Sequence, residues 1–181
     1  HLGGGAQDAI DRALVWIEGM HVAAYDNGLA PDVWSAVKNK ICDQSWKLDF
    51  GKLFQFSGGD KAEVRKAALF GSRPPQNDSV WEAARRNGFE VITYDRNVVN
   101  HEKKIDTDIV ATMIEDSYVI LQLGDEITLV SGDADYVPAV EKLKRRGIPV
   151  HVVFWKHASR ELKEIATTFT ELDPYLRHLA R

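Results

Sequence analysis

The stretch Thr128-Leu-Val-Ser131-Gly-Asp133-Ala-Asp135-Tyr136-Val-Pro138 joins a short apolar run to an amphipathic one. Residues 128–130 are β-branched or apolar, which is typical of the end of a buried strand. Residues 137–147 carry apolar side chains at helical spacing with charged side chains between them. Asp133 and Asp135 are therefore predicted to lie in the loop after a strand, where open α/β sheets bind ligands.

Asp133 and Asp135 are separated by a single residue. Two carboxylates this close repel each other unless a cation neutralises them. Alternatively, Asp135 caps the following helix and Asp133 forms a turn. That alternative explains one aspartate more readily than both, so the pattern slightly favours a cation site.

The rest of the chain alternates predicted strands with predicted helices. Nearly continuous apolar strands between helices indicate a parallel sheet that is covered on both faces. The sequence therefore predicts an α/β fold, a three-layer α/β/α sandwich around a central, mainly parallel sheet of about five strands. The predicted strands are 13–17, 64–70, 89–94, 127–130 and 149–155, and the predicted helices are 31–41, 49–56, 78–87, 107–119, 137–146 and a last helical region that starts at 161–166.

Composition limits the class of protein. The chain has 181 residues, of which 44% are hydrophobic and 28% charged, as is usual for one globular domain. Its single cysteine, Cys42, excludes an internal disulfide and suits a reducing cytosol. No apolar run reaches membrane-spanning length and no signal peptide is recognised, so we expect a cytoplasmic protein without a membrane partner. Residues 1–7 are expected to be a cloning remnant or a disordered terminus, which leaves one domain at 8–181.

Acidic side chains are predicted to converge at one edge of the sheet. Glu18 follows the first predicted strand, and Asp133 and Asp135 follow the fourth. Asp106 lies near the start of the helix before the fourth strand, on the face whose apolar residues pack on the sheet. The helix dipole would favour an acid in the first turn, but it does not explain an acid on the apolar face. Ligands that offer only oxygen select hard cations, so these four acids predict a Mg²⁺ or Mn²⁺ site.

Other common sites lack their sequence patterns. The six histidines are scattered and do not have the spacing of zinc ligands. Ser131 lacks the Gly-x-Ser-x-Gly setting of a catalytic nucleophile. The glycines at 3–5 precede the first strand instead of following it, which excludes a dinucleotide-binding turn.

Residues of about 12–175 resemble the NYN domain family, a PIN-like group of nucleases. The resemblance implies a PIN-like α/β/α sandwich, acidic metal ligands and ribonuclease activity. It rests on four stretches in the expected order: Leu14-Val-Trp-Ile-Glu18-Gly, Ala68-Leu-Phe-Gly-Ser-Arg73-Pro-Pro, Glu102-Lys-Lys-Ile-Asp106 and Leu129-Val-Ser131-Gly-Asp133-Ala-Asp135-Tyr136.

The resemblance implies that metal-dependent hydrolysis of phosphodiester bonds takes place at the four acids. One or two Mg²⁺ or Mn²⁺ ions would activate water and stabilise the charge that builds on the phosphate, so no nucleophilic side chain is needed. Asp133 is then the main ligand, and Glu18 and Asp106 complete the shell directly or through water. Asp135 orients a ligand water, and Ser131 assists.

The expected partner is RNA. Arg73, Lys103 and Lys104 border the acids and are the expected contacts to phosphate. The net charge of −4 is unlike that of proteins that grip long duplexes, so a single-stranded or short structured RNA is favoured. The oligomeric state is left open, with a homodimer among the alternatives.

Two positions depart from the family pattern. The family usually has Asp where this chain has Glu18, and Asn where it has His21. Three outcomes follow: an adapted site, weakened activity, or an RNA-binding or scaffold module that does not cut. A small-substrate Mg²⁺-dependent phosphatase on the same kind of sheet is a further alternative, because fold alone does not separate these functions.

The Glu18→Asp variant should cleave RNA faster than the parent chain in the presence of Mn²⁺. Glutamate carries its carboxylate about 1.5 Å further than aspartate does, which is large against a tolerance of about 0.5 Å in a catalytic site. His21 could compensate through a hydrogen bond, so His21→Asn belongs in a double-mutant cycle with it. Unchanged cleavage in both Glu18→Asp and Glu18→Ala would show that the first strand supplies no metal ligand.

Overall fold

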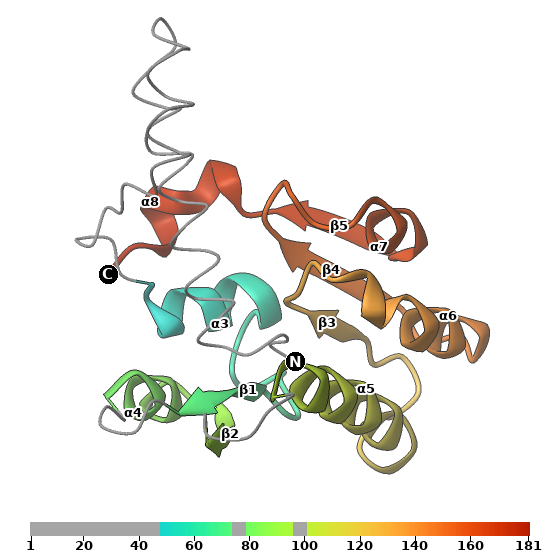
Figure 1. Ribbon diagram of the computed structural model, residues 1–181, viewed down its shortest axis with the longest axis horizontal. Coiled ribbons are helices and arrows are strands. Elements are labelled where there is room, and N and C mark those ends of the chain that lie inside the picture. The colour runs from blue at the N-terminus through green and yellow to red at the C-terminus, as the bar shows by residue number, and fades with distance from the viewer. Residues whose placement is uncertain (1–47, 74–78, 96–100) are drawn as a thin grey trace, which may run out of the picture.

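The computed structural model of the chain describes residues 48–73, 79–95 and 101–181 (Figure 1). The predicted strand 13–17 and helix 31–41, and the expectation for residues 1–7, lie outside the described residues. None of the helices that the structure describes has the length and apolar character needed to cross a lipid bilayer.

Helices and strands alternate along the described chain, as the sequence predicts. Two short 3₁₀ turns, η1 and η2, follow β3 and β5. The elements are α3 (Phe50–Gly58), β1 (Ala68–Arg73), α4 (Ser79–Arg86), β2 (Glu90–Asp95), α5 (His101–Val119), β3 (Ile127–Leu129), η1 (Ala134–Tyr136), α6 (Val137–Arg145), β4 (Val150–Phe154), α7 (Arg160–Ile165), β5 (Thr168–Glu171), η2 (Asp173–Tyr175) and α8 (Leu176–Leu179).

All pairings between the described strands are parallel. β1 pairs with β2, and β4 lies between β3 and β5. The described strands therefore form two parallel sheets, of two and three strands, and the predicted strand 13–17 lies outside the described residues. β5 itself was not predicted, because Thr168-Phe-Thr-Glu171 is only four residues long, and a short polar strand at the edge of a sheet carries little apolar signal.

The described strands lie between two layers of helices. Side chains alternate along each strand, so one set packs against α5, α6 and α7 and the other against α3, α4 and α8. In β3, for example, Ile127 and Leu129 belong to the first core, and the next residue, Val130, belongs to the second. Figure 1 shows the two groups of helices on opposite sides of the strands. The α/β/α architecture is thus confirmed.

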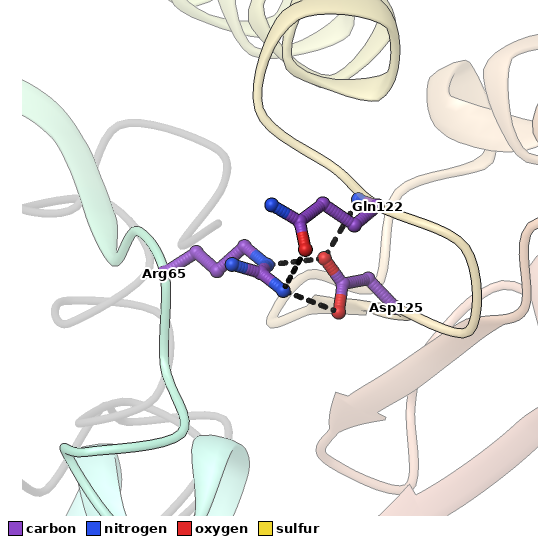
Figure 2. A network of polar contacts seen from close by, with 3 residues as sticks. All are labelled: Arg65, Gln122 and Asp125. Atoms are coloured by element: carbon purple, nitrogen blue, oxygen red, sulfur yellow. Dashed lines mark hydrogen bonds and ion pairs between the residues drawn. The ribbon is translucent and has the colours of Figure 1, made fainter.

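A polar network links the segment before β1 to the loop before β3 (Figure 2). The Arg65 guanidinium is ion-paired with Asp125 and donates to Gln122 Oε1 at 3.0 Å. The hydrogen bond from Arg65, and then the one from the Gln122 backbone, lower the pKa of Asp125. Because this network joins the amino ends of β1 and β3, the carboxyl ends of both strands lie at the opposite edge. That edge carries the predicted site.

Candidate metal centre at the carboxyl edge

The loop after β3 passes through a narrow gap. Ser131 is buried, and a side chain at Gly132 would place its Cβ 2.2 Å from the Phe154 ring and 3.0 Å from Ala158 Cα. Only glycine therefore fits at this position without displacing its neighbours. The Gly132 carbonyl also accepts a hydrogen bond of 2.7 Å from the Ser159 backbone N–H, which ties this loop to the loop after β4.

Asp133 caps the 3₁₀ turn that follows it. Its Oδ1 accepts a hydrogen bond of 3.0 Å from the Asp135 backbone N–H. The alternative interpretation assumed that Asp135 is the cap. In the structure the capping residue is Asp133. The bond restrains the Asp133 side chain, and both carboxylates are exposed to solvent. A cap accounts for the orientation of Asp133, and Asp135 is the acid in the first turn of η1.

Asp106 lies in the second turn of α5, because the helix begins at His101 and not at residue 107 as expected. The polar residues of the true first turn hide the start of the helix from a search for apolar periodicity. The dipole effect is confined to the first turn, so it does not explain this carboxylate. Asp106 is half-buried, on the side of α5 that faces the loop after β3.

Tyr136 connects Asp106 to the loop after β3. Its side chain is fully buried, and its hydroxyl donates a hydrogen bond of 2.6 Å to Asp106 Oδ1. Burial and the nearby Asp106 carboxylate raise the pKa of the Tyr136 phenol, so it stays a donor over the physiological range. Ser131 also contacts this phenol through its hydroxyl. Sequence analysis missed Tyr136, although a buried tyrosine needs a partner for its hydroxyl and carboxylates were predicted nearby.

Asp106, Asp133 and Asp135 come together at this edge. Each offers a carboxylate oxygen, and the three oxygens lie within 4.8 Å of one another. Oxygens that share one Mg²⁺ are at most about 4.2 Å apart, so a small closure, or one water between an oxygen and the ion, is enough for a common ion. The donor set contains oxygen alone, which fits a hard cation.

Lys104 lies on α5, two residues before Asp106. It is exposed, and its Nζ lies 4.9 Å from the centre of the Tyr94 ring. Tyr94 lies near the carboxyl end of β2, and its hydroxyl donates to Asp108. Burial, and then the hydrogen bond to Asp108, raise the pKa of Tyr94 to about 12. The Lys104 ammonium group thus lies over the Tyr94 ring.

For the remaining predicted site residues, the structure describes some completely, some only in their backbone, and some not at all. By its backbone, Arg73 ends β1 at this edge and Lys103 lies in the first turn of α5, but their side chains are not among those described. Glu18 and His21 lie outside the described residues. Ser131 lies in the loop before Asp133, where it is buried and contacts the Tyr136 phenol.

Millimolar Mn²⁺ or Mg²⁺ should raise the melting temperature of the protein, because three clustered carboxylates favour a bound cation in the folded state. At a concentration 100 times the Kd, binding adds about 2.7 kcal/mol to the free energy of unfolding. Thermal denaturation with and without metal measures the shift. Asp133→Asn should abolish most of it, whereas Glu115→Gln, which changes an exposed acid further along α5, should not. A melting temperature that metal does not move would argue against a metal site.

Tyr136→Phe should lower the free energy of unfolding by about 1–3 kcal/mol, because it removes the donor from a half-buried carboxylate. It should also weaken the stabilisation by Mn²⁺, since Asp106 loses the hydrogen bond that orients it. Denaturant titration at several Mn²⁺ concentrations separates the two effects. Tyr94→Phe is the matched control, because it removes a hydroxyl from Asp108 on the same helix. An equal loss of Mn²⁺ stabilisation in both variants would contradict a role for Tyr136 in orienting Asp106.

Comparison with known proteins identifies the family. The model of the NYN domain matches residues 12–173 and thus includes all three clustered acids. In structure, the chain is similar to a crystal structure of a protein of unknown function from Vibrio parahaemolyticus, with a TM-score of 0.58 and 24% sequence identity, over 72% of this chain and 82% of that chain. This likeness supports the fold. The comparison with curated proteins gives no sequence match. The chain belongs to the NYN domain family, within the PIN-like superfamily, and has the nuclease-like fold of that family together with an acidic cluster compatible with a metal site.

Proposed function

We propose that this protein is a metal-dependent ribonuclease that hydrolyses phosphodiester bonds of RNA at the acidic cluster. The observation that carries the proposal is the convergence of Asp106, from α5, with Asp133 and Asp135, from the loop after β3, within 4.8 Å in a chain of the NYN family. The family accounts for the nuclease-like fold, and the cluster supplies a place where such chemistry could occur.

The side chains that would hold the ion are Asp106, Asp133 and Asp135. A bound Mg²⁺ or Mn²⁺ supplies an activated water and stabilises the negative charge that develops on the phosphate. The protein contributes rigid geometry. Tyr136 fixes Asp106 through its hydroxyl, and the Asp135 backbone N–H fixes Asp133. Preorganisation of this kind matters because small displacements of catalytic groups cost large factors in rate.

The exposure of the acids favours a polymeric substrate over a small one. Asp133 and Asp135 are open to solvent, whereas sites for small molecules bury most of the ligand surface. A cavity of about 620 Å³ lies elsewhere, lined in part by Arg65, Glu126 and the first residues of β3. Its described lining includes none of the three clustered acids. An open edge of this kind supports RNA as the substrate more than it supports a phosphatase reaction.

Contacts to phosphate would come from cations near the site. Lys104 lies two residues before Asp106 on α5, and its Nζ lies 4.9 Å from the centre of the Tyr94 ring. Lys103 and Arg73 lie at the same edge by their place in α5 and β1. We expect these cations to position the backbone of a single-stranded or short structured RNA, since backbone contacts fix register without reading sequence.

Incubation of end-labelled single-stranded RNA with the protein, with and without Mn²⁺, tests the proposal. The parent chain should cut only with metal, and Asp133→Asn should cut at least about 100-fold more slowly because it loses a ligand carboxylate. Asp60→Asn makes the same chemical change in an exposed turn before β1 and should cut like the parent chain.

Three results would contradict the proposal. Cleavage that survives in EDTA or in Asp133→Asn would exclude metal catalysis at this cluster. RNA binding without cleavage at any Mn²⁺ or Mg²⁺ concentration would indicate a binding or scaffold module. Metal-dependent hydrolysis of p-nitrophenyl phosphate with intact RNA would indicate a phosphatase.

A further inference from the structure

The loop after β4, residues 155–159, lies beside the loop that carries Asp133. β3 and β4 are paired in parallel with Leu129 opposite Val152, so the two chains leave the sheet next to each other at its carboxyl edge. Neighbouring strands are about 4.8 Å apart. Counting from the Leu129–Val152 pair, Asp133 and Lys156 are each four residues further along their chains. The bond from Ser159 N–H to the Gly132 carbonyl confirms that the two loops touch.

The main chain of this loop is held in place from several sides. The Lys156 backbone N–H donates to Asp173 Oδ2 at 2.6 Å, and the Lys156 carbonyl accepts from Lys163 Nζ. The Ala158 N–H closes a turn onto the Trp155 carbonyl at 3.0 Å. Asp173 is itself buried. These hydrogen bonds fix the backbone of the loop, and none of them involves the Lys156 side chain.

Lys156 differs from the other cations near it. Lys144 Nζ donates to the Ile165 carbonyl, Arg160 is ion-paired with Glu164, and Lys163 Nζ is bound to the loop backbone. The Lys156 side chain is exposed, and among the residues that the structure describes its ammonium group makes no hydrogen bond or ion pair. A loop that is held by its backbone thus presents a positive charge, which also acts on the Asp173 carboxylate, beside the loop that carries Asp133. That arrangement suits a polyanion that approaches the acids from the β4 side.

We propose that Lys156 binds a phosphate of the RNA backbone on the β4 side of the acidic cluster, opposite Lys104. This inference rests on the proposed function for the identity of the ligand. The RNA would then cross the carboxyl edge of the sheet, with one flanking phosphate near the start of α5 and another at the loop after β4. Lys156 is a substrate-binding residue in this arrangement, and the chemistry stays with the acids.

Binding of labelled single-stranded RNA in EDTA, at several salt concentrations, tests this inference without cleavage. Lys156→Gln should weaken binding about two- to fivefold at 0.1 M salt, as expected for one exposed charge pair. It should also reduce the slope of log K against log salt by about 0.7, the value for one phosphate contact on a single strand. Lys156→Arg should restore both. Lys142→Gln, an equal change of charge on an exposed residue of α6, should leave both unchanged.

Two further measurements separate a binding role from a structural or catalytic one. Lys156→Gln should keep the melting temperature of the parent chain and its shift with Mn²⁺, because the side chain is exposed and the loop is held by its backbone. In cleavage assays it should raise KM while leaving kcat nearly unchanged.

The outcome of this test is distinct from that of the ribonuclease assay. Parent-like affinity and salt slope in Lys156→Gln would overturn the inference even if the protein cuts RNA. Absence of RNA binding by the parent chain would overturn it as well. Lys156-dependent binding by a chain that never cuts RNA would support the inference and overturn the proposed function.

Discussion

The hydrogen bond from the Tyr136 hydroxyl to Asp106 is the contact on which the candidate site depends. It joins two elements that are 30 residues apart in the chain, the second turn of α5 and the turn after β3. Because Tyr136 is fully buried, its ring also packs into the core between the strands and α5 to α7. The same residue thus anchors the loop to the core and directs a carboxylate toward the surface. Core packing is thereby coupled directly to the geometry of the acids.

Two neutral donors bind the acids of the cluster. Asp106 accepts from a phenol, and Asp133 accepts from a backbone N–H. Such bonds orient the carboxylates and offset part of their repulsion, but they do not neutralise the charge. A divalent ion is the largest local charge that such a site can acquire, so it would change the electrostatics of this edge more than any of these hydrogen bonds. These two hydrogen bonds therefore hold the direction of the oxygens of Asp106 and Asp133.

Much of this arrangement could be predicted from residue patterns. The alternation of strands and helices, and the position of Asp133 and Asp135 after a strand, follow from apolar periodicity and the rule for open α/β sheets. Asp106 could be placed because it shares a helical face with apolar residues. These inferences hold because burial imposes a regular spacing on the sequence.

The features that were missed depend on contacts between distant segments. β5 is short and polar, so it becomes a strand only through its pairing with β4. The start of α5 lies in polar residues that give no apolar signal. Tyr136 gains its contact from Asp106, and the position of Lys156 beside the loop of Asp133 follows from the pairing of β3 with β4. Sequence patterns predict where helices and strands lie and where they end. A contact between residues 30 positions apart, such as Tyr136 and Asp106, is determined by the fold.

The net charge of −4 is unlike that of most proteins that bind long nucleic-acid duplexes. Many of the cations are used within the protein itself. Arg65 and Lys66 pair with acids, and Arg146 stacks on Tyr118 and binds Ser117. Binding would then rest on a few cations beside the acids, such as Lys104 and Lys156, and not on a broad basic surface. A footprint of this size contacts few phosphates, and each contact to a single strand adds only about 0.7 to the salt dependence. The same charge balance that argues against a grip on long duplexes is therefore compatible with a site that holds a short segment of RNA across one edge of the sheet.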